Sequence, residues 1–159
     1  MPWGELQRVL YRDGHGLAAL AEVLDALAGK ARVYVEVKGL GIEQAVIDVL
    51  RGSAALTAVH AFDHRIVKRV RTLAPEIPAG ILVEAYLLDA PHALRAADAR
   101  DYWPDWRFCD QALIDAVHAV GARVIAWTAN DPRIISALTA SGIDGLCTDD
   151  VRLLSAHAP

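Results

Sequence analysis

The sequence predicts an α/β fold built from parallel strands. Short apolar segments, rich in β-branched residues, alternate with amphipathic segments of helical spacing, and the connections between them are short. Strands that alternate with helices run parallel and are joined by right-handed crossovers. A doubly wound open sheet and an eight-stranded (β/α) barrel both satisfy this pattern. In both folds, functional side chains lie where strands end and helices begin.

The first half of the chain shows the alternation clearly. Gly29 and Gly52 each end a segment of helical spacing, and Pro75 and Pro78 follow a basic helical segment. We expect, in order, a helix at 17–27, a strand at 33–38, a helix at 42–50, a strand at 56–62, a helix at 64–73 and a strand at 80–86.

The second half continues the pattern less evenly. Pro104 lies within residues 101–108, which predicts an irregular segment or an edge strand there. Asn130 or Asp131 would cap a helix that begins near Pro132. We expect, in order, helices at 91–97 and 111–120, a strand at 123–128, a helix at 132–140, a strand at 145–148 and a helix at 151–156.

Composition limits the classes of function. A chain of 159 residues with 54% hydrophobic residues fits a single domain with a substantial core. The net charge of -4, scattered along the chain, argues against nucleic acid as a partner. No apolar stretch is long enough to span a membrane, and the N-terminus does not resemble a signal peptide. Cys109 and Cys147 form no metal or disulfide pattern, so we expect a reducing, cytoplasmic location.

The segment VYVEVKG carries the strongest candidate site. Side chains alternate along a strand, so Glu36 and Lys38 share one face while the three valines share the other. A carboxylate and an ammonium at the end of a strand could hold a metal ion and a phosphate. They could equally form a simple ion pair on a solvated face. Polar residues also follow the later strands, in AFDH, WTAND and CTDD, which supports a functional edge.

Other polar residues are weaker candidates. Asp63 and Asp149 lie at the same predicted edge and could add metal ligands, but helix capping is their commoner role. Each of the six histidines, His15, His60, His64, His92, His118 and His157, fits a surface or capping role better than catalysis. Trp127 fits either a pocket wall or plain core packing.

Several motifs, in order through most of the chain, resemble the glycerophosphodiester phosphodiesterase family. The resemblance begins with LAALAEVLDAL, which is similar to the family's PTLEEVL helix, and VYVEVKG, which is similar to its E-x-K strand. It continues with AVHAFDHRIVKRVRTLAPEIPAG, similar to the family's SFD segment. It ends with DQALIDAVHAVGARVIAWTAND and GIDGLCTDD, similar to the WTVND block and the closing GVDGIITD.

The resemblance implies a TIM barrel that hydrolyses glycerophosphodiesters to glycerol 3-phosphate and an alcohol, with a divalent metal such as Mg or Ca. By that resemblance Glu36 is a metal ligand, Lys38 meets the phosphate and Trp127 lines the substrate pocket. A hard divalent ion takes carboxylate oxygen, and a lysine supplies a point charge to phosphate oxygens. The implied setting is lipid metabolism, with a small phosphodiester as the partner.

The family's His-Arg-Gly, Glu-Asn and His-Asp motifs have no counterpart in this sequence. We therefore expect residues 1–159 to form one domain that is truncated at the N-terminus relative to the family, with about six of eight βα units. The family's catalytic histidines are absent, so we assign no catalytic residue and expect little or no activity from this chain alone. A non-catalytic module that binds glycerol phosphate is the alternative. The first and last strands would be open edges, which favour self-association.

Overall fold

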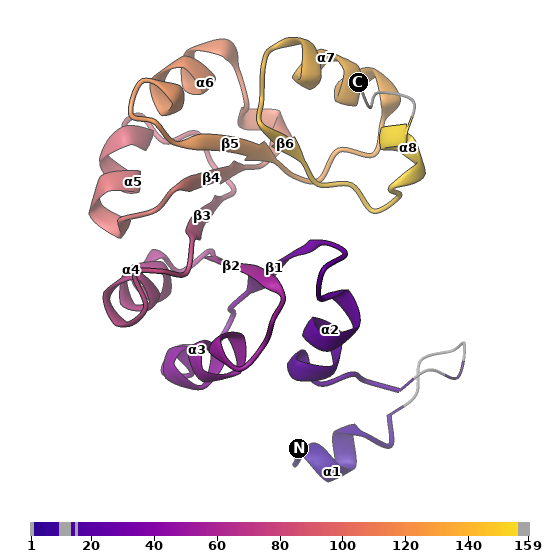
Figure 1. Ribbon diagram of the computed structural model, residues 1–159. Helices are drawn as coiled ribbons and strands as arrows, with labels where there is room; N and C mark the ends of the chain where they lie inside the picture. The colour runs from indigo at the N-terminus through magenta and orange to yellow at the C-terminus, as the bar shows by residue number, and fades with distance from the viewer. Residues whose placement is uncertain (1, 10–13, 15, 156–159) are drawn as a thin grey trace.

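The computed structural model describes residues 2–9, 14 and 16–155. Six parallel strands form one curved sheet in the order β1-β2-β3-β4-β5-β6 (Figure 1). The strands are β1 (Arg32–Glu36), β2 (Leu56–Ala61), β3 (Ala79–Val83), β4 (Asp101–Pro104), β5 (Arg123–Ala126) and β6 (Gly145–Leu146). We call the side of the sheet where these strands end the carboxyl edge, and the side where they begin the amino edge.

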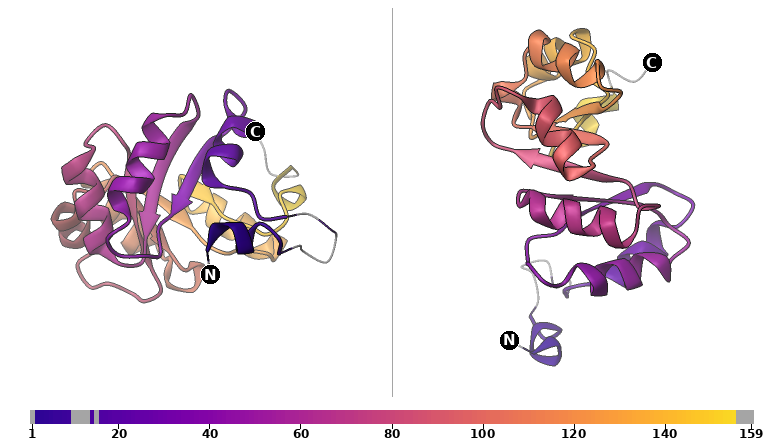
Figure 2. Two further views of the ribbon diagram at one scale, coloured as in Figure 1. Left: turned by 90° about the horizontal axis from the view of Figure 1, so that it is seen from below. Right: turned by 90° about the vertical axis from the view of Figure 1, so that its left-hand side faces the viewer.

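Helices connect successive strands and cover the convex face of the sheet (Figures 1 and 2). They are α2 (Leu20–Leu27), α3 (Glu43–Arg51), α4 (His64–Leu73), α5 (Ala90–Ala97), α6 (Gln111–His118), α7 (Pro132–Ala140) and α8 (Arg152–Ser155). A short α1 (Trp3–Leu6) lies apart at the N-terminal end (Figure 1), and a 3-10 turn (Trp106–Phe108) follows β4. The helices predicted from the sequence are present, although α2 and α8 begin later than expected.

The arrangement is an arc of a barrel. A doubly wound sheet carries helices on both faces, whereas here they cover one face and leave the concave face open (Figure 1). Among the described strands, β1 pairs only with β2 and β6 only with β5, so both ends of the arc are open as expected.

The main core lies between the strands and the helices. Val37, Val59 and Ile81 point outward from the sheet and are almost completely buried against that layer, as the valine alternation predicts. Burying such side chains contributes about 1.5 to 3 kcal/mol each. A second, smaller cluster on the concave face contains Leu82, Trp103 and Ile125. The sheet is therefore packed on its outer face and lined by larger side chains on its inner face.

Strand β4 corrects one sequence-based expectation. Residues 101–104 form neither an edge strand nor an irregular segment, because β4 pairs with β3 on one side and β5 on the other. Pro104 is tolerated because it is the last residue of the strand. The next amide, that of Asp105, donates the hydrogen bond to the Val83 carbonyl at 2.9 Å. The irregular part begins only at the 3-10 turn.

Candidate functional site at the carboxyl edge

The candidate site begins at the end of β1. Glu36 is the last residue of this strand, and Lys38 follows it in an extended segment. The Lys38 Nζ lies 3.7 Å from the Glu36 Oε2, and the side chains are 80% and 31% exposed, respectively. This distance and exposure describe a loose, hydrated ion pair whose contribution to stability is below about 1 kcal/mol. Either charge can therefore turn to a ligand at little cost.

A hollow of about 620 Å³ lies beside Glu36 on the concave face. Its wall includes Tyr34 from β1, His60 from β2, Trp103 from β4 and Arg123 from β5, together with residues around β6. The hollow thus spans the concave face from one open end of the arc to the other. Its size is within the range of small-molecule sites.

Trp127 lies directly after β5, where its indole Nε1 donates a hydrogen bond to the Trp103 carbonyl at 2.9 Å. Its ring also meets Phe62 edge to face, with 5.4 Å between the ring centroids. Phe62 follows β2 and is 46% exposed. The aromatic pair therefore connects the ends of β2 and β5 at the carboxyl edge, next to the concave face. Trp127 therefore combines core packing against Leu82 and Ile125 with a place at the carboxyl edge.

His60 is on the inner face, which corrects the expected surface or capping role. It is the register partner of Glu36, its ring lies 4.6 Å from that of Trp103, and its Nδ1 is buried without a hydrogen-bond partner. Burial lowers the pKa of His60 to about 4, although the nearby Asp101 carboxylate acts in the opposite direction. The imidazole is therefore neutral near pH 7.

The amino end of the inner face is closed by a buried ion network. Asp101, 1% exposed, accepts two hydrogen bonds from Arg100 at 2.8 Å and two from Arg123 at 2.9 Å. Arg123 also donates to the Tyr34 hydroxyl at 2.9 Å, which joins β5 to β1 across the arc. Burial raises the pKa of the Asp101 carboxyl, but the two guanidinium groups outweigh it and hold that pKa below its usual range. This network supports the floor beneath Glu36 and His60.

The other predicted polar residues have structural roles. Asp63 caps α4 by accepting from the Arg65 amide, and Asp131, not Asn130, caps α7 in the same way. Asp149 accepts a hydrogen bond from the Asn130 side chain at 2.7 Å. His64 and His92 lie in the first turns of α4 and α5, and His118 lies at the end of α6. His15 and His157 lie outside the described residues.

The glycerophosphoryl diester phosphodiesterase family matches residues 17–153 of this chain. The chain belongs to that family. A glycerophosphodiester phosphodiesterase of Caldanaerobacter subterraneus is 24% identical over 149 residues, which cover 89% of this chain and 61% of that protein. A Bacillus subtilis relative is 26% identical over 147 residues, or 86% of this chain and 60% of its own length. The chain thus spans about three fifths of the curated relatives it matches.

Solved structures of family members share the fold. A phosphodiesterase of Oleispira antarctica, solved in complex with the product sn-glycerol-3-phosphate, superposes with a TM-score of 0.88 at 22% identity, covering 98% of this chain and 70% of that one. A glycerophosphodiester phosphodiesterase of Thermotoga maritima gives a TM-score of 0.75 at 18% identity, covering 92% of this chain and 66% of that one. The arc of six strands is therefore an incomplete TIM-barrel-type fold.

The carboxyl edge, within the described residues, does not hold a complete set of metal ligands. Within the described residues, no three His, Cys, Asp or Glu side chains lie close enough together to hold a metal ion. A hard divalent cation needs six or more oxygen ligands, of which side chains usually supply several. Asp105 is bound by Arg107 at 2.7 Å and Glu84 lies 4.0 Å from the same guanidinium, so both already have cationic partners. Glu36 would be one ligand, and the described residues alone do not fit a complete site.

The sequence missed three residues of the inner face. Tyr34 could have been found, because it lies two positions before Glu36 and so shares its face. Arg123 and Asp101 gave no local signal, since their pairing depends on strands β4 and β5 being neighbours in the sheet.

Proposed function

We propose that this chain forms the phosphate-facing part of a glycerophosphodiester phosphodiesterase. In that reaction a water oxygen forms a bond to phosphorus, the bond from phosphorus to the alcohol oxygen breaks, and the alcohol leaves with a proton that originated in the water. The observation that carries the proposal is the pair of Glu36 and Lys38 at the carboxyl end of β1, beside the 620 Å³ hollow. The family match over residues 17–153 gives this pair its context.

Each residue has a proposed role. The Lys38 ammonium pairs with a non-bridging phosphate oxygen, because its 80% exposure leaves it free to leave Glu36. Glu36 would supply one oxygen ligand to a divalent cation in the whole enzyme, where the cation would neutralise the charge of the phosphate. Trp127 and Phe62 offer an aromatic wall to the glycerol or the alcohol.

We propose that the chain alone has little or no turnover. Transfer of the proton from water to the leaving alcohol needs an acid and a base, and the family's two histidine motifs are missing from the sequence. His60 does not replace them. With a pKa of about 4 its imidazole carries no proton to donate near pH 7, and it is only a weak base. The missing parts of the barrel would also supply the further metal ligands.

The test is release of choline from glycerophosphocholine in the presence of Mg²⁺ or Ca²⁺. We expect turnover below detection for the chain alone, and measurable turnover when the family's two N-terminal βα units are fused ahead of it. Glu36→Ala should abolish the turnover of the fused protein, whereas Glu76→Ala, at the amino edge, should not. Turnover by the chain alone that Glu36→Ala abolishes would refute the proposed impairment.

The second candidate is a binding module without catalysis. It is favoured by the exposure of Lys38 and by the lack, within the described residues, of three metal-ligating side chains close together. Calorimetry with glycerol 3-phosphate, with and without a chelator, separates the two functions. Binding that resists the chelator and is lost in Lys38→Ala, but not in Lys30→Ala on the loop after α2, supports the module.

We also propose a partner and a location. The open edges of β1 and β6 can pair with strands from a second chain, so we propose self-association. Light scattering that finds a stable monomer would contradict this.

We also propose one domain over residues 1–159, placed in the cytoplasm in lipid metabolism. Cys109 and Cys147 are free thiols in the structure, as a reducing compartment permits. In the described residues, no helix is long and apolar enough to cross a membrane.

A further inference from the structure

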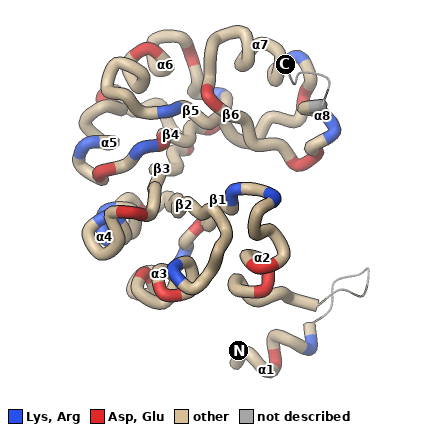
Figure 3. Tube along the Cα trace, viewed as in Figure 1, with Lys and Arg blue, Asp and Glu red and all other residues tan. Residues whose placement is uncertain are grey.

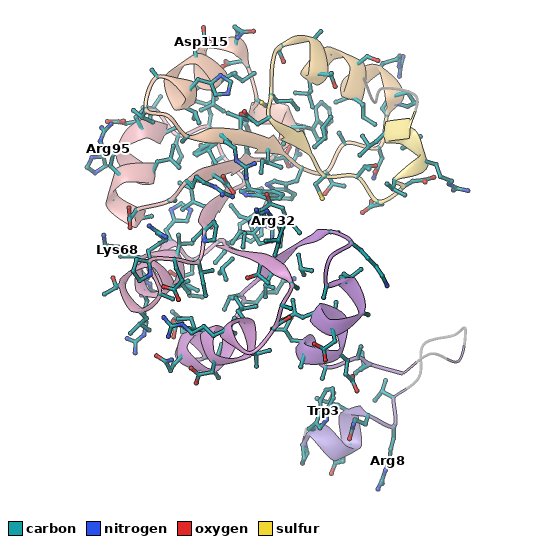
Figure 4. All side chains as sticks on the ribbon, in the orientation of Figure 1. Trp3, Arg8, Arg32, Lys68, Arg95 and Asp115 are labelled. Atoms are coloured by element: carbon teal, nitrogen blue, oxygen red, sulfur yellow. The ribbon has the colours of Figure 1, made fainter. Side chains whose placement is uncertain are left out.

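The two end strands of the arc are less covered than the inner strands. Among the described residues, β3 is buried along its whole length, whereas the middle of β1 and both residues of β6 are only partly buried. Val33 and Val35 point toward the helix layer and still remain partly exposed. Unpaired strand edges with half-covered apolar side chains are surfaces to which a further strand can add. Figure 4 labels Arg32, the first residue of the free edge of β1.

The 620 Å³ hollow of the concave face lies between these two edges. β1 contributes Tyr34 and Glu36 to its wall, and the segment around β6 and α8 contributes residues 144–148, Val151 and Leu154. Val151 is 74% exposed, although it lines the hollow. In a closed barrel of eight strands, side chains from the strands fill the interior. The hollow is therefore interior space that the six described strands leave unfilled.

Two buried nitrogen atoms beside the hollow lack a hydrogen-bond partner within the described residues. They are the Trp103 Nε1 and the His60 Nδ1, and both side chains line the hollow. Trp103 is 6% exposed, and its Nε1 lies so close to Gly80 that a Cβ there would be 2.8 Å away. Buried polar atoms in folded proteins almost always have a partner, and an indole N–H can only donate. An acceptor for this N–H therefore has to come from a group other than the described residues.

The fold sets the size of a partner that would fill the gap. Eight parallel strands close a TIM barrel, and six are described here, so the gap between β6 and β1 has room for two. This chain matches 70% of the Oleispira antarctica phosphodiesterase, which is close to six eighths. A second copy of this chain could pair at one edge, but its six strands are too many for the gap. Charges of both signs lie near both ends of the arc, so charge does not exclude a neutral partner (Figure 3).

We propose that the gap between β6 and β1 binds a separate polypeptide of two βα units. Its two strands run parallel to β6 and β1 and pair with their free edges, as in strand addition to an open sheet. Its inward side chains fill the hollow and cover Val151, and one of them accepts the hydrogen bond of the Trp103 indole. Its helices continue the outer layer over Val33 and Val35. This binding rests on the fold that the chain shares with its family and requires no hydrolysis.

The test is coexpression of the whole chain with a tagged fragment. The fragment is the family's two N-terminal βα units, taken from the Oleispira antarctica phosphodiesterase, and the complex is purified through its tag. We expect the two chains to copurify in equal amounts. Val151→Arg should reduce the amount of copurified chain about tenfold, because it places a charge in the hollow. Leu88→Arg is the matched control, because Leu88 is 99% exposed on the loop between β3 and α5 and does not line the hollow.

Two NMR readouts locate the bound fragment. The Val37 amide donates to the His60 carbonyl on β2, so alternation directs the amides of Tyr34 and Glu36 to the free edge. In the complex these two amides should exchange at least about tenfold more slowly than in the free chain, a larger change than in β3. The Trp103 indole N–H resonance, assigned with Trp103→Phe, should move downfield as the N–H gains an acceptor.

Four outcomes would overturn the proposal. The tagged fragment could be purified without the chain, or Val151→Arg could copurify as well as Leu88→Arg. The complex could form while the Tyr34 and Glu36 amides exchange as in the free chain, which would place the fragment elsewhere. A dimer of the chain that excludes the fragment and becomes a monomer in Val151→Arg would assign the gap to a second copy.

The variants and the readouts are independent of the proposed reaction. Because Val151 and Leu88 are exposed, unchanged urea midpoints should show that both variants fold. No readout depends on phosphodiester hydrolysis, so failure of the enzyme assay leaves this test intact.

Discussion

The buried Asp101 network gives the sharpest prediction about stability. Asp101→Asn keeps the size of the side chain but removes the charge that accepts four hydrogen bonds from Arg100 and Arg123. Breaking a fully buried ion pair costs about 3 to 5 kcal/mol. Here the two arginines are 39% and 37% exposed and can take up water, so we expect a loss of about 2 to 4 kcal/mol.

The assay is urea unfolding of the wild type and the variant, followed by circular dichroism. Asp131→Asn is the matched control. Its ion pair with Arg133 is exposed and asparagine can still cap α7, so its loss of stability should be much smaller than that of Asp101→Asn. Guanidinium hydrogen bonds lower the pKa of Asp101 in the folded protein. The ionised Asp101 therefore stabilises the fold at pH values above the unfolded-state pKa of about 3.9, and this stabilisation is lost as the pH falls through the pKa of the folded state. Equal losses in the two variants at pH 7 would refute this reasoning.

Three further predictions concern the inner face and the thiols. Burial lowers the pKa of His60 from 6.5 to about 4, so the free energy of unfolding of the wild type should fall by up to about 3 kcal/mol as the pH is lowered from 6.5 to 4. His60→Gln should reduce this loss, and urea midpoints that change equally with pH in the two proteins would contradict the prediction. A Cβ on Gly80 would lie 2.8 Å from the Trp103 Nε1, so Gly80→Ala should lower the free energy of unfolding by about 2 kcal/mol or more. The control is Gly52→Ala, whose Cβ would meet its nearest atoms at an ordinary 3.5 Å, and it should change the free energy of unfolding by less than about 1 kcal/mol. Burial raises the pKa of the Cys109 thiol to about 11, so iodoacetamide at pH 8 should alkylate it at least about 100-fold more slowly than a free cysteine, as peptide mass spectrometry can measure.

The order of the elements could be predicted from the sequence because it rests on local patterns. The alternating valines of β1 and the glycine and proline stops mark strands and helix ends without reference to distant residues. The placement of Glu36 and Lys38 on the inner face also follows from the period of a strand. Their functional roles remain predictions.

The remaining features depend on which strands are neighbours. Pro104 argued for an edge strand, but its position at the last residue of β4 avoids the lost hydrogen bond, and no local rule reveals that. His60 looked like one polar residue among many, until the curvature of the sheet brought Trp103 against it. The pairing of Asp101 with Arg123 likewise requires two strands separated by a helix to lie side by side.

Each described strand in the sheet pairs with the strand that comes next in the chain, and this has a consequence for folding. Every strand interface is closed by one intervening helix, so backbone pairing in the arc passes only between nearest neighbours, as in a linear array. Contacts across the concave face, such as that of Arg123 with Tyr34, add to this pairing. Folding of such an arc can begin at any internal βα unit. Unfolding of a terminal βα unit removes one strand interface and leaves the other interfaces in place. We therefore expect unfolding to begin at the ends, with amide hydrogen exchange fastest in β1 and β6 and slowest in β3 and β4.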